Sequence, residues 1–153
     1  MNLRIDTHTH TVLSGHAHST LLENLLFAKK KGLEGIVVTD HSGGMEGVQS
    51  AACVGLLRDV PQEYDGVRIY RGTETNIINS KGEVDLPLRY LQFVEFAIAS
   101  MHDNVICSQG EKQDTDAMIG ALNNPYIDVI GHPGNPFFQI DIEAVVLEAK
   151  RLN

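Results

Sequence analysis

The sequence predicts an α/β protein built around a parallel β-sheet that helices cover on both faces. Short apolar runs with β-branched residues alternate with helical patterns along the chain. These runs are continuously apolar, which is typical of strands buried on both faces. The chain has 153 residues, of which 42% are hydrophobic and 21% charged. That length suits a single domain over residues 1–153 and is too short for two.

Five apolar segments are predicted as strands, and a helical segment follows each of them. Apolar and β-branched residues recur in every segment, and polar or turn-forming residues bound it. In chain order the predicted strands are residues 3–7 (LRIDT), 35–39 (GIVVT), 67–72 (VRIYRG), 94–100 (VEFAIAS) and 127–131 (IDVIG).

The helices between these strands are predicted from helical patterns and capping signals. Thr20 and Glu23 have the spacing of a capping box, and Gly32 follows the last turn of that helix. Asp114 and Asp141 are candidate N-caps of the last two helices. The predicted helices are residues 20–31, 45–59 (in part), 85–92, 114–123 and 140–152.

The end of the chain bears on the architecture of the sheet. The sequence stops directly after a predicted helix, and five strands are too few to close a parallel barrel. The sheet is therefore expected either to be open or to form part of a larger barrel.

Charge and hydropathy exclude several classes of protein. No apolar run approaches the roughly 18 residues that a membrane span needs. Asp6 and the first histidines interrupt the N-terminus before a signal peptide could form, so a cytoplasmic location is expected. The formal net charge of −8 argues against a nucleic-acid-binding surface, and no basic and aromatic residues interleave. If an anion binds, bound cations are the expected attraction.

Metal-binding residue types follow each predicted strand. In a parallel α/β sheet the carboxyl ends of the strands share one edge, where such folds place their active sites. These positions are His8 and His10 after the first strand, His41 after the second, Glu74 after the third, His102 after the fourth and His132 after the fifth. They are therefore expected to converge.

The local spacing supports this convergence. Strand side chains alternate with a period of two, so His8 and His10 are expected on the same side, together with Asp6. His16 lies in the following loop and could fold back over the same edge, whereas His18, just before a helix N-cap, is interpreted as a structural residue. Asp6 and Asp40 neighbour these positions and are expected either to orient an imidazole or to be purely structural.

Neutral imidazoles and carboxylates are the usual ligands of zinc, manganese and iron. Six imidazoles are too many for one ion, which takes about three or four protein ligands. A cluster of two or three divalent ions is therefore expected, with zinc favoured and manganese or iron as alternatives. Glu74 could bridge two of these ions through its two carboxylate oxygens.

The segments "DTHTHT", "TDHS", "GTETN", "ASMH" and "GHPG" resemble the PHP (polymerase and histidinol phosphatase) family. They span residues 6–134, and "SGHAHST" and "ASMHDN" are most similar to its YcdX-like phosphatase branch. This resemblance implies a distorted seven-stranded β/α barrel with a trinuclear metal site, often zinc. By the same resemblance, the first ion takes His8, His10 and Glu74; the second takes Glu74, His102 and His132; and the third takes His16 and His41.

The chain departs from the family pattern at its C-terminal end. The family has an Asp-x-His motif after a later strand, and this sequence has no histidine beyond His132. We therefore expect five strand–helix units of the barrel, incomplete in this chain, with the third ion weak or absent. The uncovered first and fifth strands predict self-association or association with a complementary fragment.

The resemblance and the ligand set together predict a metal-dependent phosphoesterase, a hydrolase in which metal-activated hydroxide attacks phosphorus. The residues assigned to catalysis are Glu74, His102 and His132. The expected substrate is a small phosphomonoester, and no nucleophile triad or P-loop is present. A phosphodiesterase or exonuclease acting on nucleotide ends is the nearest alternative. A metal-binding module without activity in this 153-residue form is the second.

Overall fold

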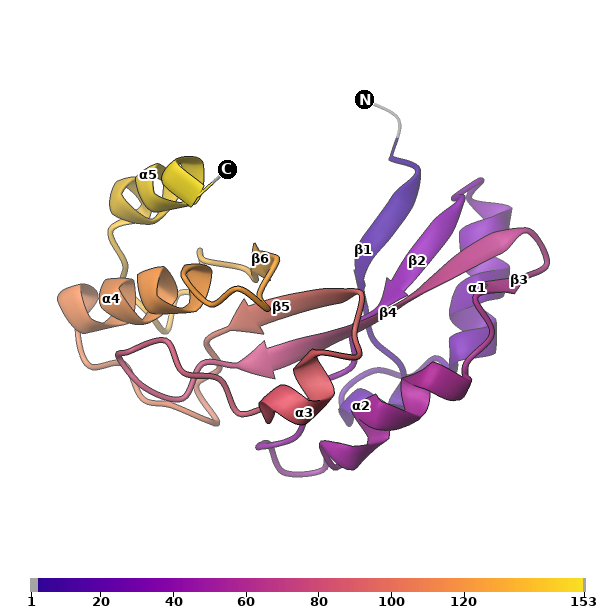
Figure 1. The fold of residues 1–153 in the computed structure, drawn as a ribbon, viewed down its shortest axis with the longest axis horizontal. Coiled ribbons are helices and arrows are strands. Elements are labelled where there is room, and N and C mark those ends of the chain that lie inside the picture. The colour runs from indigo at the N-terminus through magenta and orange to yellow at the C-terminus, as the bar shows by residue number, and fades with distance from the viewer. Residues whose placement is uncertain (1–2, 153) are drawn as a thin grey trace.

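The computed structural model describes residues 3–152, which form a mixed α/β fold around one curved sheet (Figure 1). In the described chain the strand order is β1-β2-β4-β5-β6, with β3 paired to β4. Every pair along this path is parallel, and β3 pairs antiparallel with β4. The strands are β1 (Ile5–Thr9), β2 (Gly35–Val38), β3 (Glu63–Tyr64), β4 (Val67–Asn76), β5 (Phe96–Ser100) and β6 (Val129–Ile130). The predicted α/β class and parallel sheet are confirmed.

All five predicted strands are present, but the third is longer than predicted. Residues 68–71 of β4 pair with β2, and residues 72–76 pair with β5. The two neighbours thus extend β4 to ten residues, four beyond the predicted end. Glu74 consequently lies inside the strand rather than after it.

A short antiparallel strand was not predicted. Asp65 and Gly66 join β3 to β4, and both have positive φ, 51° and 83°. A two-residue Asp-Gly connection is a strong hairpin signal because both central residues of such turns adopt left-handed conformations. The sequence therefore contained the signal for β3.

The capping predictions for the first and last long helices are confirmed. Thr20 and Glu23 form a reciprocal capping box at the start of α1, and Gly32 beyond its end has a φ of 73°. The Asp141 carboxylate accepts a hydrogen bond from the Ala144 amide in the first turn of α5. The helices are α1 (Leu21–Lys30), α2 (Ala52–Leu56), α3 (Leu88–Leu91), α4 (Glu111–Leu122) and α5 (Ile142–Leu152), with 3-10 helices at Val12–Ser14 and Leu57–Asp59.

Two helix predictions need correction. Asp114 is not an N-cap, because α4 begins at Glu111 after Gly110. The Asp114 carboxylate lies one turn inside the helix, where it accepts hydrogen bonds from Ser108 Oγ and the Gln109 amide and so holds the preceding loop. The helix predicted over residues 85–92 contains only the four residues of α3. Asp85 lies outside it, because its carboxylate bonds to β4.

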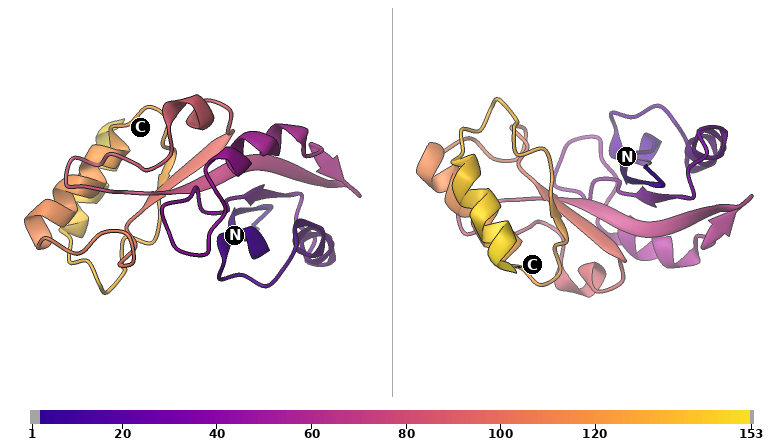
Figure 2. Two further views of the ribbon diagram at one scale, coloured as in Figure 1. Left: turned by 90° about the horizontal axis from the view of Figure 1, so that it is seen from below. Right: turned by 90° about the horizontal axis from the view of Figure 1, so that it is seen from above.

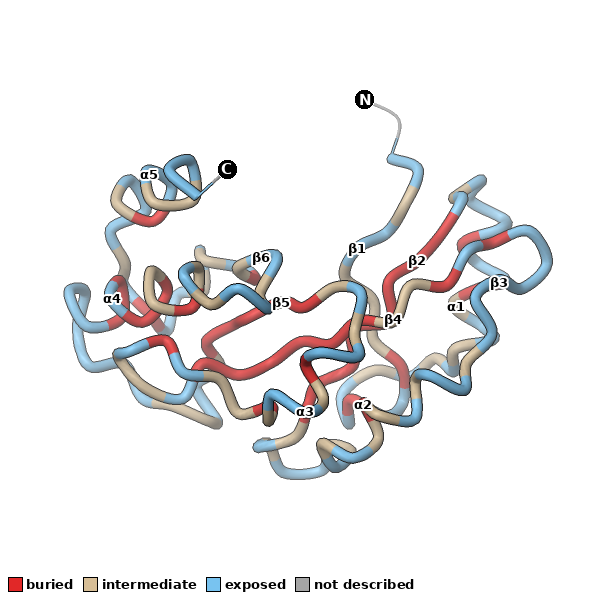
Figure 3. The backbone as a smooth tube through the Cα atoms, in the orientation of Figure 1, coloured by how far each residue is buried: buried red, intermediate tan, exposed pale blue. Residues whose placement is uncertain are grey.

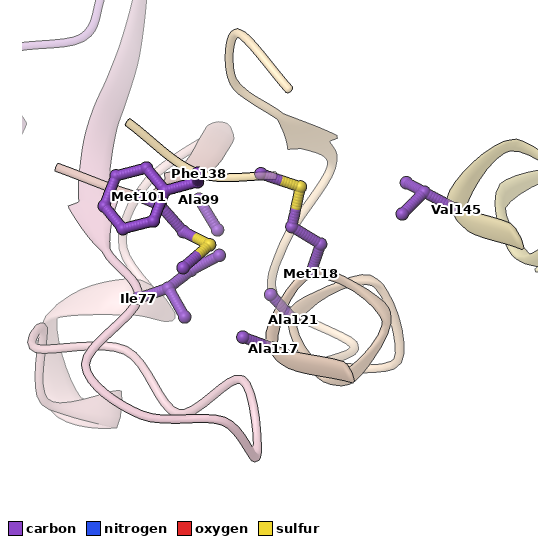
Figure 4. Close-up of a cluster of buried hydrophobic side chains, with 8 residues drawn as sticks. All are labelled: Ile77, Ala99, Met101, Ala117, Met118, Ala121, Phe138 and Val145. Carbon is purple, nitrogen blue, oxygen red and sulfur yellow. The ribbon is translucent and has the colours of Figure 1, made fainter. Parts of the chain in front are cut away.

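Burial is concentrated on the central strands β2, β4 and β5 (Figure 3). In the part of the chain that the structure describes, three apolar clusters form the core. The one in Figure 4 joins the carboxyl-terminal half of the sheet to α4 and α5. Its buried members are Ile77, Ala99, Met101, Ala117, Met118, Ala121, Phe138 and Val145. Packing on both sides of the sheet fixes the strand ends that carry the candidate ligands.

The sheet is curved and open, with β1 and β6 as its edges (Figure 2). On α5 the apolar side chains of Ile142, Val146 and Leu147 are about half exposed. Association with another polypeptide and closure by seven strands stay predictions. No helix among the described residues combines the length and apolar character that crossing a bilayer requires.

Candidate metal centre

The seven predicted ligands meet at one open cavity of about 1000 Å³. They lie at the carboxyl ends of β1, β2, β4, β5 and β6 or in the loops beyond them. The cavity is lined by His8, His10, His16, His41, Met45, Glu74, His102, Asp103, Asn104, His132, Gly134 and Asn135. The expected convergence is therefore observed, and His18 is exposed away from this lining.

Glu74 lies at the centre of the cluster, and one of its oxygens faces three imidazoles. The side chain is 1% exposed because β4 is covered on both sides. Its Oε2 lies 3.2 Å from His8 Nε2, from His10 Nε2 and from His41 Nδ1. His8 and His10 are themselves close, with their Nε2 atoms 3.0 Å apart.

The second oxygen of Glu74 faces the other side of the cluster. Its Oε1 lies 3.0 Å from His132 Nε2 and 3.4 Å from His102 Nε2. The same oxygen accepts a hydrogen bond of 2.6 Å from Ser100 Oγ on β5. A single carboxylate thus contacts five imidazoles that come from four different strand ends, as a bridging ligand would.

The charge of this buried carboxylate is maintained by its neighbours. Burial by itself would raise the pKa of Glu74, but the surrounding imidazoles outweigh it and hold the pKa well below its usual range. Burial also lowers the pKa of His41 to about 4, although Glu74 partly opposes this shift. His41 is therefore neutral at pH 7, which is the state that binds a metal.

His132 shows that the chain is constrained at this edge. Its φ is +25°, which is unusual for a residue with a side chain. A hydrogen bond that its ring donates to the Glu74 carboxylate raises the pKa of His132, although burial acts against this. Just before it, Gly131 has no room for a side chain, because a Cβ there would lie 2.0 Å from Ser100 Oγ. Gly131 therefore does more than form a turn.

The donor atoms have the chemistry and spacing that a divalent cation needs. Two nitrogens bound to one tetrahedral zinc at about 2.0–2.1 Å lie roughly 3.3 Å apart. The Nε2 atoms of His8 and His10, and those of His16 and His41, are each 3.0 Å apart. His41 Nδ1 is buried without a hydrogen-bond partner, which a cation would satisfy.

Among residues 3–152, three groups of side chains could each hold an ion. The donor atoms of each group lie within 4.8 Å of one another. The groups are His8, His10 and Glu74; His10, His16 and His41; and His41, Glu74 and His102. The first is the ligand set that the family resemblance implies for the first ion. The other implied sets are adjacent in space, and their roles as ligands stay predictions.

Asp40 touches the cluster through a serine that was not predicted. Its Oδ1 accepts a hydrogen bond of 2.5 Å from Ser14 Oγ. Because that hydroxyl has one hydrogen, His10 Nδ1 must be the donor in its 2.8 Å contact with Ser14. In neutral His10, Nε2, which faces Glu74, then carries no hydrogen. This contact favours the orienting role for Asp40, whereas Asp6 accepts a backbone bond from His8.

Ser14, Ser100 and Asn76 are the polar contacts of the cluster that sequence reasoning missed. Ser14 follows His10 by four residues, and Ser100 precedes His102 by two and so shares its strand parity. Asn76 follows Glu74 by two residues and likewise shares its strand parity. These spacings are the signal that could have identified them.

No protein-family model matches the chain. It is 46% identical over 151 residues to a probable phosphatase of Caldanaerobacter subterraneus, covering 98% of this chain and 59% of the relative. It is 48% identical over 153 residues to a probable phosphatase of Caldicellulosiruptor saccharolyticus, covering 100% and 64%. The chain thus spans about three fifths of the length of the curated relatives it matches.

One solved structure reproduces the fold. The chain superposes with a TM-score of 0.61 on histidinol phosphate phosphatase from Lactococcus lactis, whose crystal contained zinc, L-histidinol and phosphate. The identity is 19%, and the match covers 99% of this chain and 70% of that one. This chain therefore has the fold of a histidinol phosphate phosphatase and is similar, along almost its whole length, to proteins named probable phosphatase.

Proposed function

We propose that this chain carries the metal centre of a metal-dependent phosphatase that hydrolyses small phosphomonoesters. The observation that supports this most strongly is the buried Glu74 carboxylate, whose two oxygens contact five imidazoles at the floor of an open cavity. The names of the relatives and the zinc and phosphate in the neighbour's crystal agree with it. The relatives that carry this name are longer, and the chain spans about three fifths of their length.

The ligand assignment follows the contacts. His8, His10 and Glu74 would hold one ion, and Glu74, His102 and His132 a second. His16 and His41 would contribute to a third, weaker site. Zinc suits this imidazole-rich set best, and manganese or iron are the alternatives. The resemblance to the YcdX-like branch of the PHP family supports the same assignment.

The residues of this chain prepare the site for an anionic substrate. When bound, the cations would supply positive charge for the phosphate oxygens and a water whose pKa is lowered to about 7. The described lining contains no Lys or Arg, so its own side chains supply little positive charge to attract a phosphate. Glu74 remains ionised, as its lowered pKa indicates. His132, 42% exposed, is the most accessible histidine in contact with Glu74.

The test is turnover of p-nitrophenyl phosphate after metal removal and reconstitution with zinc or manganese, with bound metal counted by elemental analysis. Glu74→Gln should abolish turnover and remove at least one ion per chain. Glu34→Gln is the matched control, because Glu34 lies at the surface before β2 and pairs with Arg4. Glu74→Gln with full metal content and turnover would exclude the bridging role.

The same assay separates the alternatives. Turnover of bis-p-nitrophenyl phosphate in preference to the monoester would favour the phosphodiesterase. Bound metal without turnover of either ester would favour a metal-binding module without activity.

A further inference from the structure

Asn76, the last residue of β4, has an amide whose orientation is set by its partners. The side chain is fully buried, and its Nδ2 donates hydrogen bonds to the Gly43 carbonyl at 2.8 Å and to Asp85 Oδ2 at 2.6 Å. Both partners only accept. The amide oxygen must therefore be the atom that faces His102 Nδ1, at 2.7 Å.

This contact determines where His102 carries its hydrogen. An amide oxygen only accepts hydrogen bonds, so His102 Nδ1 must donate. In the neutral ring Nε2 then has a free lone pair. That nitrogen lies 3.4 Å from Glu74 Oε1 and lines the cavity. The neutral ring of His102 is thus held in the one tautomer that can bind a cation through Nε2.

Asp85 holds the Asn76 amide in place. Besides Nδ2 of Asn76, the carboxylate accepts hydrogen bonds from the Asn76 amide N–H at 2.9 Å and from Ser42 Oγ at 2.7 Å. The loop that contains Gly43 and Gly44 packs closely against the Asp85 carboxylate. Gly44 has a φ of +75°, and a Cβ there would lie 2.5 Å from Asp85 Oδ2. The loop, the carboxylate and the amide therefore form one rigid unit behind His102.

We propose that Asn76 and Asp85 are positioning residues that fix the Nδ1–H tautomer of His102 and present its Nε2 to a divalent cation. Ser14 and Asp40 make the equivalent arrangement behind His10, from a separate part of the chain. The proposal rests on the proposed function for the identity of the bound cation. The tautomer itself is a property of the metal-free protein, so it can be measured separately.

The test combines nitrogen NMR of the metal-free protein with zinc affinity. In ¹⁵N-histidine-labelled protein at pH 8, with His102 assigned from the His102→Gln spectrum, Nδ1 should carry the hydrogen and Nε2 should be bare. In Asp85→Asn the new amide can donate to Asn76. The Asn76 amide can then turn its Nδ2 toward His102, which moves the hydrogen to Nε2. Zinc affinity, measured by competition with a chromophoric chelator, should fall about 10–100-fold.

Asn79→Ala is the matched control, because Asn79 lies in the turn after β4 and bonds only within that turn, to residues 81–83. It should leave both the tautomer and the affinity unchanged. Asn76→Ala, checked for folding by circular dichroism, should also remove the preference of His102 for a hydrogen on Nδ1.

Two results would overturn the proposal. The first is a hydrogen on Nε2 of His102 in the unsubstituted protein, which needs no variant to fold. The second is an unchanged tautomer and zinc affinity in folded Asp85→Asn. Zinc binding with the expected tautomer but no hydrolysis would refute the proposed function and support the positioning role.

Discussion

Gly131→Ala probes how closely the end of β6 approaches the metal centre. A methyl group at this position would lie 2.0 Å from Ser100 Oγ, 3.0 Å from Ile98 Cγ2 and 3.3 Å from Ser100 Cβ. The first distance is far inside van der Waals contact. Ser100 Oγ cannot move freely, because it donates a hydrogen bond to Glu74. Either that bond breaks or the two strands separate.

The expected cost follows from this overlap. Overpacking a well-packed core costs about 1–3 kcal/mol, which for a domain of this size lowers Tm by roughly 2–12 °C. Ser100→Ala alone should cost a similar amount, about 1–3 kcal/mol, because Glu74 loses a buried donor. The double variant should lose less stability than the two single variants lose when their losses are added. Without Oγ, the nearest side-chain contact of the new methyl group is 3.0 Å away.

Thermal and urea unfolding of the metal-free protein would measure all three variants. Gly134→Ala is the control in the same turn, where a Cβ meets nothing within 4 Å. It should change stability by less than about 0.5 kcal/mol. Gly131→Ala with unchanged stability, or a cost that Ser100→Ala does not reduce, would show that the two strands do not approach in this way.

Two further predictions concern pH and helix capping. Burial lowers the pKa of His41 to about 4 in the folded state, so the unfolded chain binds more protons between pH 4 and 6.5. The stability that neutral His41 contributes is therefore fully present above pH 6.5 and is lost as the pH falls toward 4. The raised pKa of His132 acts in the opposite sense. Comparing metal-free His41→Asn with the unsubstituted protein isolates the first effect, and the variant should lose about 2 kcal/mol less between pH 7 and pH 5. An equal loss in both would contradict the buried neutral state of His41. Thr20→Ala should remove the capping box of α1 and cost about 1 kcal/mol in urea unfolding, and a change no larger than that of Thr7→Ala, on exposed β1, would count against it.

The strands and the ligand positions were predictable because their signals are local. An apolar run followed by His or Glu places that side chain at the carboxyl edge of a parallel sheet, whatever the rest of the chain does. This reasoning located His41, His102 and His132 correctly at the cavity. It also located Glu74, although pairing with two successive neighbours extends β4 past it.

Asp114 and Asp85 show where local reasoning fails. The sequence predicts Asp114 as an N-cap, because Asp is common at such positions, and places Asp85 as the first residue of a helix. In the structure each carboxylate instead bonds to a loop or strand: Asp114 to Ser108, and Asp85 to Asn76 and Ser42. A side chain with several available donors takes those that the packed chain brings nearest, and Ser42 is 43 residues away from Asp85.

The sequence by itself determined where the five main strands lie along the chain, the chemical identity of the candidate ligands and the edge of the sheet at which they gather. Residue type and periodicity act over a few residues, so they can be interpreted without knowing the fold. Only the tertiary structure decided which nitrogen faces which oxygen of Glu74, and which serine and asparagine orient His10 and His102. Those contacts join residues up to 66 positions apart, such as His8 and Glu74, and they depend on loop conformations that form only when the strands pack.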